Sequence, residues 1–180
     1  MKASISTLLA SIAIAGPALA APPPADHQQF LNTMASDGIN VLINEPPQVC
    51  YNDKDMSGMY TVINNERYLV VCQDNRKNNK MVAWTENDLD TIRHEGFHII
   101  QDCMAGANND MVFDTVFTNL DDVIDALGVS KAMEVTKIYL EAYSGRSDIS
   151  NAINYEIEAV YAARDYSAAE LNSMYTEYCM

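Results

Sequence analysis

The pattern of hydrophobic and polar positions changes character at Thr85. Before it, four segments between residues 47 and 84 are candidate strands: "QVCYN", "MYTVINN", "RYLVVCQ" and "KMVAW". The first three are rich in Val, Tyr, Ile and Leu, which favour strands, and polar, turn-rich segments separate the four. The pattern predicts a small antiparallel sheet, preceded by a short helix over residues 30–40.

After Thr85, hydrophobic residues recur with the helical period of 3.6. Thr85 is a favourable N-cap for the first helix, and Glu86 and Asp88 place negative charge in its first turn. Gly106 predicts the end of this helix. Further helices are predicted in "TNLDDVIDALG", "SKAMEVTKIYLEAY", "ISNAINYEIEAVYAARDY" and "SAAELNSMYTEYC". Sheet and helices together predict an α+β fold, with the sheet packed on a mostly helical body.

The first twenty residues are typical of a secretory signal peptide. "MKASISTLLASIAIAGPALA" combines an early lysine, an apolar run and a small-residue ending, which predicts cleavage after Ala20. The apolar run is too short to span a bilayer, which needs about 20 residues. Residues 21–29 form a proline-rich lead-in, and residues 30–180 are predicted to fold as a single domain. We therefore expect a secreted or periplasmic protein with no membrane span in its mature chain.

Charge and composition narrow the classes of partner. The 180-residue chain carries 11 basic and 25 acidic residues, for a formal net charge of −14. Such a surface repels phosphate backbones and anionic headgroups, so nucleic-acid binding and membrane-surface binding are disfavoured. With 48% hydrophobic residues, the chain is able to bury one compact core.

The four cysteines all lie in the mature chain. An even number in an exported chain of this size predicts two disulfides, for which three pairings exist. Neighbouring strands would bring Cys50 near Cys72. Cys103, at the end of the central helix, would then pair with Cys179. None of these residues shows CxxC spacing, so a cysteine zinc site is not expected.

"TIRHEGFHIIQDC", residues 91–103, is the strongest candidate for chemistry. In a helix, His94 and His98 lie one turn apart on one face, where two imidazoles can reach a single Zn²⁺ ion. Glu95 lies about 100° further round, from where it can reach a metal-bound water without binding the metal. A chance HExxH motif is rare in a chain of this length, which favours the zinc interpretation over incidental polar residues.

A catalytic zinc needs a third protein ligand and an open position. No histidine follows the motif, and His27 in the lead-in is disfavoured, so a carboxylate on the helix predicted over residues 149–166 is the candidate. Glu156 and Glu158 project about 200° apart, so only one is expected to face the first helix. Glu158 is favoured because it precedes Ala159, whose small side chain lets the helices approach closely. Glu156 would then be a solvated helix acid.

The "HEGFH" motif, followed downstream by "YEIEAVYAA", resembles the gluzincin metallopeptidases. The resemblance covers two short helices and implies a zincin-like catalytic domain that hydrolyses peptide bonds in a peptide or protein substrate. It makes His94, His98 and Glu158 the zinc ligands and Glu95 the general base. The strict ExxxD form of the family's glutamate motif is absent, because Ala162 stands four residues after Glu158.

The resemblance also implies how a substrate is held. An edge strand just before the zinc helix, at "KMVAW", would pair with the substrate backbone. Gln101 or Asp102 could accept a hydrogen bond from a ligand imidazole and fix its tautomer, or could form an ordinary polar helix end. A further donor would stabilise the oxyanion, and the candidates are Tyr139, Tyr143, Tyr155, Tyr161, Arg93 and Arg146.

Three functions are compatible with these patterns, and the exported zinc metallopeptidase is favoured. A zinc-dependent amidase acting on cell-wall material would keep the same ligands but need a different cleft. A non-enzymatic exported binding or structural module would make the motif incidental. Metal content separates the third function from the first two.

Overall fold

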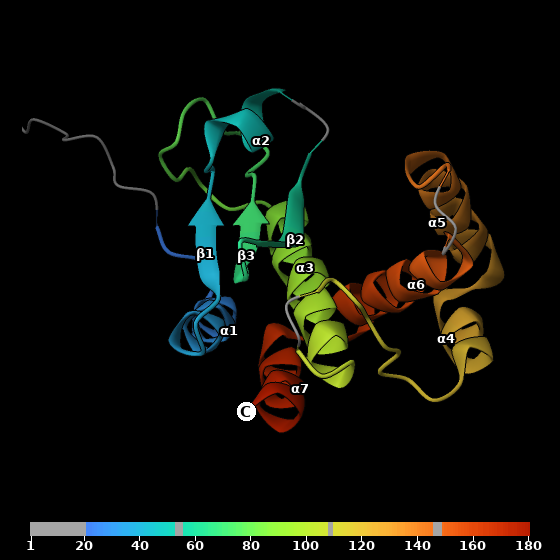
Figure 1. The fold of residues 1–180 in the computed structure, drawn as a ribbon. Coiled ribbons are helices and arrows are strands. Elements are labelled where there is room, and N and C mark those ends of the chain that lie inside the picture. The colour runs from blue at the N-terminus through green and yellow to red at the C-terminus, as the bar shows by residue number, and fades with distance from the viewer. Residues whose placement is uncertain (1–20, 53–55, 108–109, 146–148) are drawn as a thin grey trace, which may run out of the picture.

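A computed structural model describes residues 21–52, 56–107, 110–145 and 149–180. In this part of the chain, a three-stranded sheet packs on a body of helices, which confirms the predicted α+β class (Figure 1). The predicted signal peptide, residues 1–20, lies outside the described residues. Among the described helices, none is both long enough and apolar enough to cross a membrane.

The sheet has the strand order β1-β3-β2. Strands β2 (Gly58–Ile63) and β3 (Glu66–Val71) form an antiparallel hairpin, whose turn residues Asn64 and Asn65 both have positive φ, as a tight hairpin turn requires. Strand β1 (Asn40–Ile43) pairs with β3 in parallel, so the prediction of an antiparallel sheet is right only for the hairpin. The chain passes through helix α2 (Pro47–Asn52) after β1 and returns on the far side of β3, which makes β2 an edge strand.

Two predicted strands are not strands. "QVCYN" lies in helix α2 (Pro47–Asn52), where Pro47 takes the first helical position and its missing N–H costs no hydrogen bond. "KMVAW" forms neither strand nor helix. The buried Gln73 side chain accepts from the Val82 N–H at 2.9 Å and donates to the Val82 carbonyl at 3.0 Å. The Gln73 side chain thus satisfies the backbone N–H and carbonyl groups of Val82 that would otherwise pair with a neighbouring strand.

The first helix begins earlier than expected. Helix α1 (Ala25–Ser36) starts within the proline-rich lead-in and ends before residue 40. Its Phe30 ring packs directly on the backbone of Gly96, where a Cβ would lie 2.6 Å from the ring. The lead-in is part of the folded structure, since Pro23 is buried and the Trp84 indole donates to the Ala21 carbonyl at 3.2 Å.

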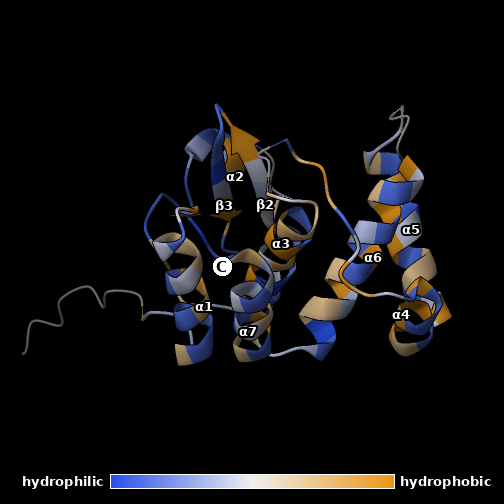
Figure 2. Cartoon of the chain, turned by 60° about the horizontal axis from the view of Figure 1, so that its bottom comes forward, coloured by the Kyte–Doolittle hydropathy of each residue, from blue (hydrophilic) through white to orange (hydrophobic). Residues whose placement is uncertain are grey.

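Helix α3 (Glu86–Met104) is the central element and contacts the sheet, α1, α6 (Ile149–Asp165) and α7 (Ala168–Cys179). It begins as predicted, with Thr85 and Asp88 in a reciprocal capping box. Helices α4 (Leu120–Leu127) and α5 (Val129–Ala142) pack on α6. The second view shows α4 and α5 grouped beside α6, which itself packs on α3 (Figure 2).

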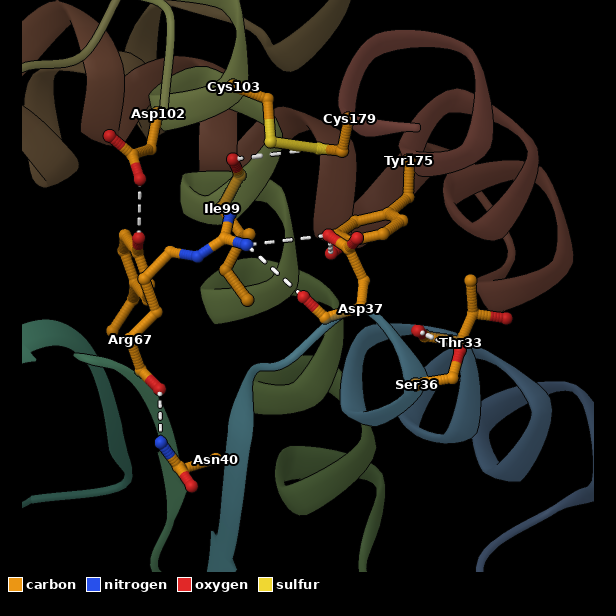
Figure 3. Close-up of polar contacts among 11 residues, drawn as sticks. Thr33, Ser36, Asp37, Asn40, Arg67, Ile99, Asp102, Cys103, Tyr175 and Cys179 are labelled. Carbon is orange, nitrogen blue, oxygen red and sulfur yellow. Dashed lines mark hydrogen bonds and ion pairs between the residues drawn. A yellow bond between two sulfur atoms is a disulfide. The ribbon is translucent and has the colours of Figure 1, made fainter. Parts of the chain in front are cut away.

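Two disulfides brace this arrangement, and both predicted pairings are confirmed. Cys50–Cys72 joins α2 to the end of β3, and Cys103–Cys179 joins the last turn of α3 to α7. Beside the second disulfide, Arg67 of β3 reaches Asp37 at the end of α1, and the Tyr175 hydroxyl of α7 donates to Asp37 at 2.6 Å (Figure 3). Two disulfides fit an extracellular protein.

Candidate metal centre

Two neighbouring helices bring three potential metal ligands together. His94 and His98 lie one turn apart on α3, as the motif predicts, and Glu156 of α6 faces them. The Glu156 Oε2 atom lies 3.2 Å from His94 Nε2 and 3.3 Å from His98 Nε2, and the two Nε2 atoms are 3.1 Å apart. One ligand atom from each residue lies within 4.8 Å of the others, close enough for a single ion to bind all three.

The third member of this group is Glu156, which corrects the preference for Glu158. The Glu158 carboxylate points to the other side of α6, where it accepts from the Gln101 side chain at 3.0 Å and from the backbone N–H groups of Val116 and Phe117, both at 3.1 Å. Both glutamates are buried, because α6 packs against α3 and also against α4 and α5. Since the sequence indicated only one apolar stripe, neighbouring residues could not reveal which acid met the histidines.

The orientation of the His98 ring follows from its contact with Gln101. The Gln101 amide nitrogen donates to the Tyr155 carbonyl at 3.1 Å and to Glu158 at 3.0 Å, so the amide oxygen must face His98 Nδ1, 2.7 Å away. Nδ1 therefore carries a proton, and Nε2 faces the group of three. Gln101 makes the contact expected of it. Asp102 instead accepts from the Tyr60 hydroxyl at 2.5 Å.

The protein satisfies this group electrostatically before any metal binds. Burial alone would lower the pKa of His98, but the charge and hydrogen bond of Glu156 outweigh it and raise that pKa to about 9. Burial opposes ionisation of Glu156 too, yet the two imidazoles hold its pKa well below the usual range. The metal-free site is therefore an imidazolium–carboxylate pair, in which a proton occupies the place that a cation could take.

Glu95 lies next to the group but does not belong to it. Its Oε2 accepts from the backbone N–H of Tyr60 in edge strand β2 at 2.8 Å. Gly58 permits this approach, because a Cβ there would lie 2.5 Å from the Thr91 side chain and 3.2 Å from Glu95 Cγ. The Glu95 carboxylate is therefore held at the junction between helix α3 and the sheet edge.

These side chains line an open cleft of about 990 Å³ between the edge of the sheet and helices α5 and α6. No residue of "KMVAW" lines it, so edge strand β2 stands where that segment was expected. The lining includes Gly58, Tyr60, His94, Glu95, His98, Phe113, Tyr139, Tyr143, Tyr155 and Glu156.

Three of the candidate hydrogen-bond donors to the oxyanion line the cleft, namely Tyr139, Tyr143 and Tyr155. The Tyr143 hydroxyl donates to Glu156 at 2.5 Å, and the neighbouring Tyr139 ring packs against Tyr143 at a tilt, with centroids 5.6 Å apart. Burial and the charges of Glu156 and Glu95 raise the pKa of Tyr139.

Two other candidate oxyanion donors, Tyr161 and Arg93, do not line the cleft. Tyr161 packs against Phe117 and Tyr166. Arg93 donates to the Ala163 carbonyl at 2.7 Å and meets His27 Nε2 at 2.9 Å, so this arginine and His27 brace α1 against α3 and α6. Arg146 is outside the described residues.

Comparison with known proteins assigns no family to this arrangement. No family model matches the chain, and neither the curated proteins nor the solved structures include a match.

Proposed function

We propose that His94, His98 and Glu156 bind zinc and that the protein is an exported metallopeptidase of gluzincin type. The observation that carries the proposal is the convergence of two imidazole nitrogens and one carboxylate oxygen on one point of an open cleft. Two histidines and a glutamate, with a fourth position left for water, are a typical ligand set of catalytic zinc. The two disulfides support export, because such bonds persist in oxidising compartments.

In this proposal, zinc supplies Lewis-acid activation of water and of the scissile carbonyl. Glu95 acts as the general base, taking a proton from the attacking water and passing it to the leaving amine. Its position supports that role, because it borders the group of three without joining it. Tyr139 and Tyr143 stand on the opposite wall and are the preferred donors to the oxyanion.

The cleft suits an extended peptide. Strand β2 pairs only with β3 within the described sheet, so its other edge is open along the cleft. The Tyr60 N–H points to this open edge, where Glu95 now accepts from it. A substrate backbone that adds to this edge would lie between Glu95 and the wall formed by α5 and α6, which is β-augmentation.

The first test is elemental analysis of purified residues 21–180 alongside a Glu156→Gln variant. We expect about one zinc per chain in the first protein and loss of zinc in the second, since a direct ligand is removed. Arg164→Gln is the matched control on α6. Arg164 donates to the carbonyls of Ala126 and Leu127 and touches none of the three residues, so this variant should keep its zinc. An unchanged zinc content in Glu156→Gln would refute the assignment of the site.

The second test concerns Glu95. A Glu95→Gln variant should retain zinc but lose at least a factor of about 10²–10⁴ in hydrolysis of an unfolded protein, the usual contribution of a general base. If the wild type hydrolyses a cell-wall amide bond and does not cleave unfolded protein, the protein is an amidase and not a peptidase. A Glu95→Gln variant that is as active as the wild type would remove Glu95 from the mechanism.

A further inference from the structure

Glu158 is a fully buried acid near the site, and nothing in the proposed chemistry uses it. Its side chain is 0% exposed, although it stands only two residues from Glu156. Its carboxylate accepts three hydrogen bonds, one from Gln101 and two from the backbone of the segment that follows α3. A buried carboxylate is costly unless donors satisfy it, so this arrangement needs an explanation beyond solubility.

The first link runs from Glu158 to His98. Glu158 and the Tyr155 carbonyl both accept from the amide nitrogen of Gln101, which turns its amide oxygen toward His98 Nδ1. If the Gln101 amide turned over, its NH₂ group would face Nδ1. His98 would then have to lose the Nδ1 proton and carry its proton on Nε2, the atom that faces Glu156. That tautomer is unable to ligate a metal from Nε2.

The second link runs from Glu158 to the segment after α3. The Val116 and Phe117 N–H groups are bound to Glu158, and the Asp114 N–H donates to the Gln101 carbonyl at 3.1 Å. These bonds position Phe113, whose ring stacks on the His98 imidazole at a centroid distance of 5.4 Å and an interplanar angle of 11°. The ring of His98 is thus fixed at its Nδ1 edge and on one face by groups that Glu158 organises.

We propose that Glu158 is a positioning residue for the metal centre: through Gln101 it keeps a proton on His98 Nδ1, so that Nε2 is the nitrogen available to a metal, and through Val116 and Phe117 it keeps Phe113 against the ring. The proposal rests on the proposed function, in which His98 is a zinc ligand. Partners of this kind typically contribute 10–100-fold to metal affinity or activity.

The test compares zinc affinity, by competition with a chromogenic chelator, in the wild type and in Glu158→Gln. We expect about 10–100-fold weaker binding in Glu158→Gln. Gln101→Met should weaken zinc by a similar factor while leaving the two backbone hydrogen bonds of Glu158 in place. The exchanged pair Q101E/E158Q offers His98 Nδ1–H a carboxylate and should recover part of the affinity. Arg164→Gln is the control for a general loss of α6 packing.

A second readout does not depend on zinc. In metal-free wild type, the buried His98 Nδ1–H proton should give a slowly exchanging resonance in nuclear magnetic resonance spectra of histidine-labelled protein. Glu158→Gln and Gln101→Met should lose this resonance, and the exchanged pair should restore it. If the wild type binds no zinc, the proposed function fails, while this resonance still tests the positioning.

Wild-type zinc affinity and an unchanged resonance in Glu158→Gln would overturn the proposal and leave Glu158 a structural residue. The same conclusion follows if Arg164→Gln weakens zinc as much as Glu158→Gln does. Should Glu158→Gln fail to fold, Gln101→Met decides, because wild-type zinc affinity and an intact resonance in that variant would show that Glu158 does not act on His98 through Gln101, the link that the proposed choice of tautomer requires.

Discussion

The two sides of helix α6 present the same side chain in opposite settings. On the cleft side, Glu156 meets two imidazoles, which hold its pKa well below the usual range despite its burial. On the sealed side, burial raises the pKa of Glu158, and only amide donors offset the effect. The imidazole partners of Glu156 carry a proton that a cation can replace, whereas the partners of Glu158 are N–H groups that stay in place. The partners, more than the residue type, decide which acid is available for chemistry.

Leucine substitutions at Glu156 and Glu158 should give the largest difference in stability between the two sides of α6. Glu158→Leu leaves three donors without their acceptor, so we expect a loss of at least about 3 kcal/mol in the free energy of unfolding, at about 1–3 kcal/mol per unsatisfied buried group. Glu156→Leu should cost less, because His98 can lose its extra proton once the neighbouring charge is gone. Urea unfolding of metal-free protein measures both. Equal losses would mean that the two sides do not differ in this way.

The dependence of stability on pH should come from the cleft side. The pKa of His98 is raised from 6.5 to about 9, so its contribution is complete below pH 6.5 and is lost as the pH rises toward 9. The pKa of Glu156 is lowered from 4.5, so its contribution is present above pH 4.5 and is lost on acidification. Metal-free protein should therefore be most stable between about pH 4.5 and 6.5.

Thermal unfolding in the presence of a chelator measures this pH profile. Glu156→Gln should flatten its alkaline side, because the charge that raises the pKa of His98 is gone. Zinc affinity should show the opposite trend and increase with pH, since binding displaces the His98 proton. A profile that is the same in wild type and in Glu156→Gln would contradict the ion pair.

The smallest effect on stability is expected at the sheet edge. Gly58→Ala places a Cβ 2.5 Å from the Thr91 side chain, 2.8 Å from the Val70 carbonyl oxygen and 3.2 Å from Glu95 Cγ, so β2 has to shift against its neighbours. We expect about 1–2 kcal/mol of destabilisation from this overpacking and a larger loss of peptidase activity, with zinc content unchanged. Ser57→Ala, one residue away on the cleft wall, is the matched control. Full activity in Gly58→Ala would show that β2 does not set the position of Glu95.

The elements predicted well are those that local signals define. Thr85 and Asp88 mark the start of α3 in the sequence. The spacing of His94 and His98 places both on one face, because the geometry of a helix depends on the spacing of its residues. The disulfide pairing was predicted correctly although one of its grounds was wrong, because Cys50 lies on helix α2 and not on a strand.

The wrong predictions concern features that depend on contacts between residues that are not neighbours in the sequence. The Gln73 side chain forms hydrogen bonds with the N–H and carbonyl groups of Val82, which prevents a strand there. The periodicity of the sequence does not reveal this contact. The choice between Glu156 and Glu158 depended on α6 being covered on more than one side, which only the assembled helices show. Pro47 was the one overlooked local signal, because proline at a first helical position favours the helix that forms.

Gly96, between the two histidines, has a consequence for how the molecule opens. Glycine is among the weakest helix formers, and here it makes room for the Phe30 ring, so the stretch of α3 that carries the candidate ligands relies on a neighbour for its rigidity. That neighbour is α1, near the start of the described chain. When α1 detaches in a local opening, the backbone amides from Gly96 to Ile100 should become exposed to solvent with it. Hydrogen exchange would then report α1 and the ligand-bearing turn as one cooperative unit.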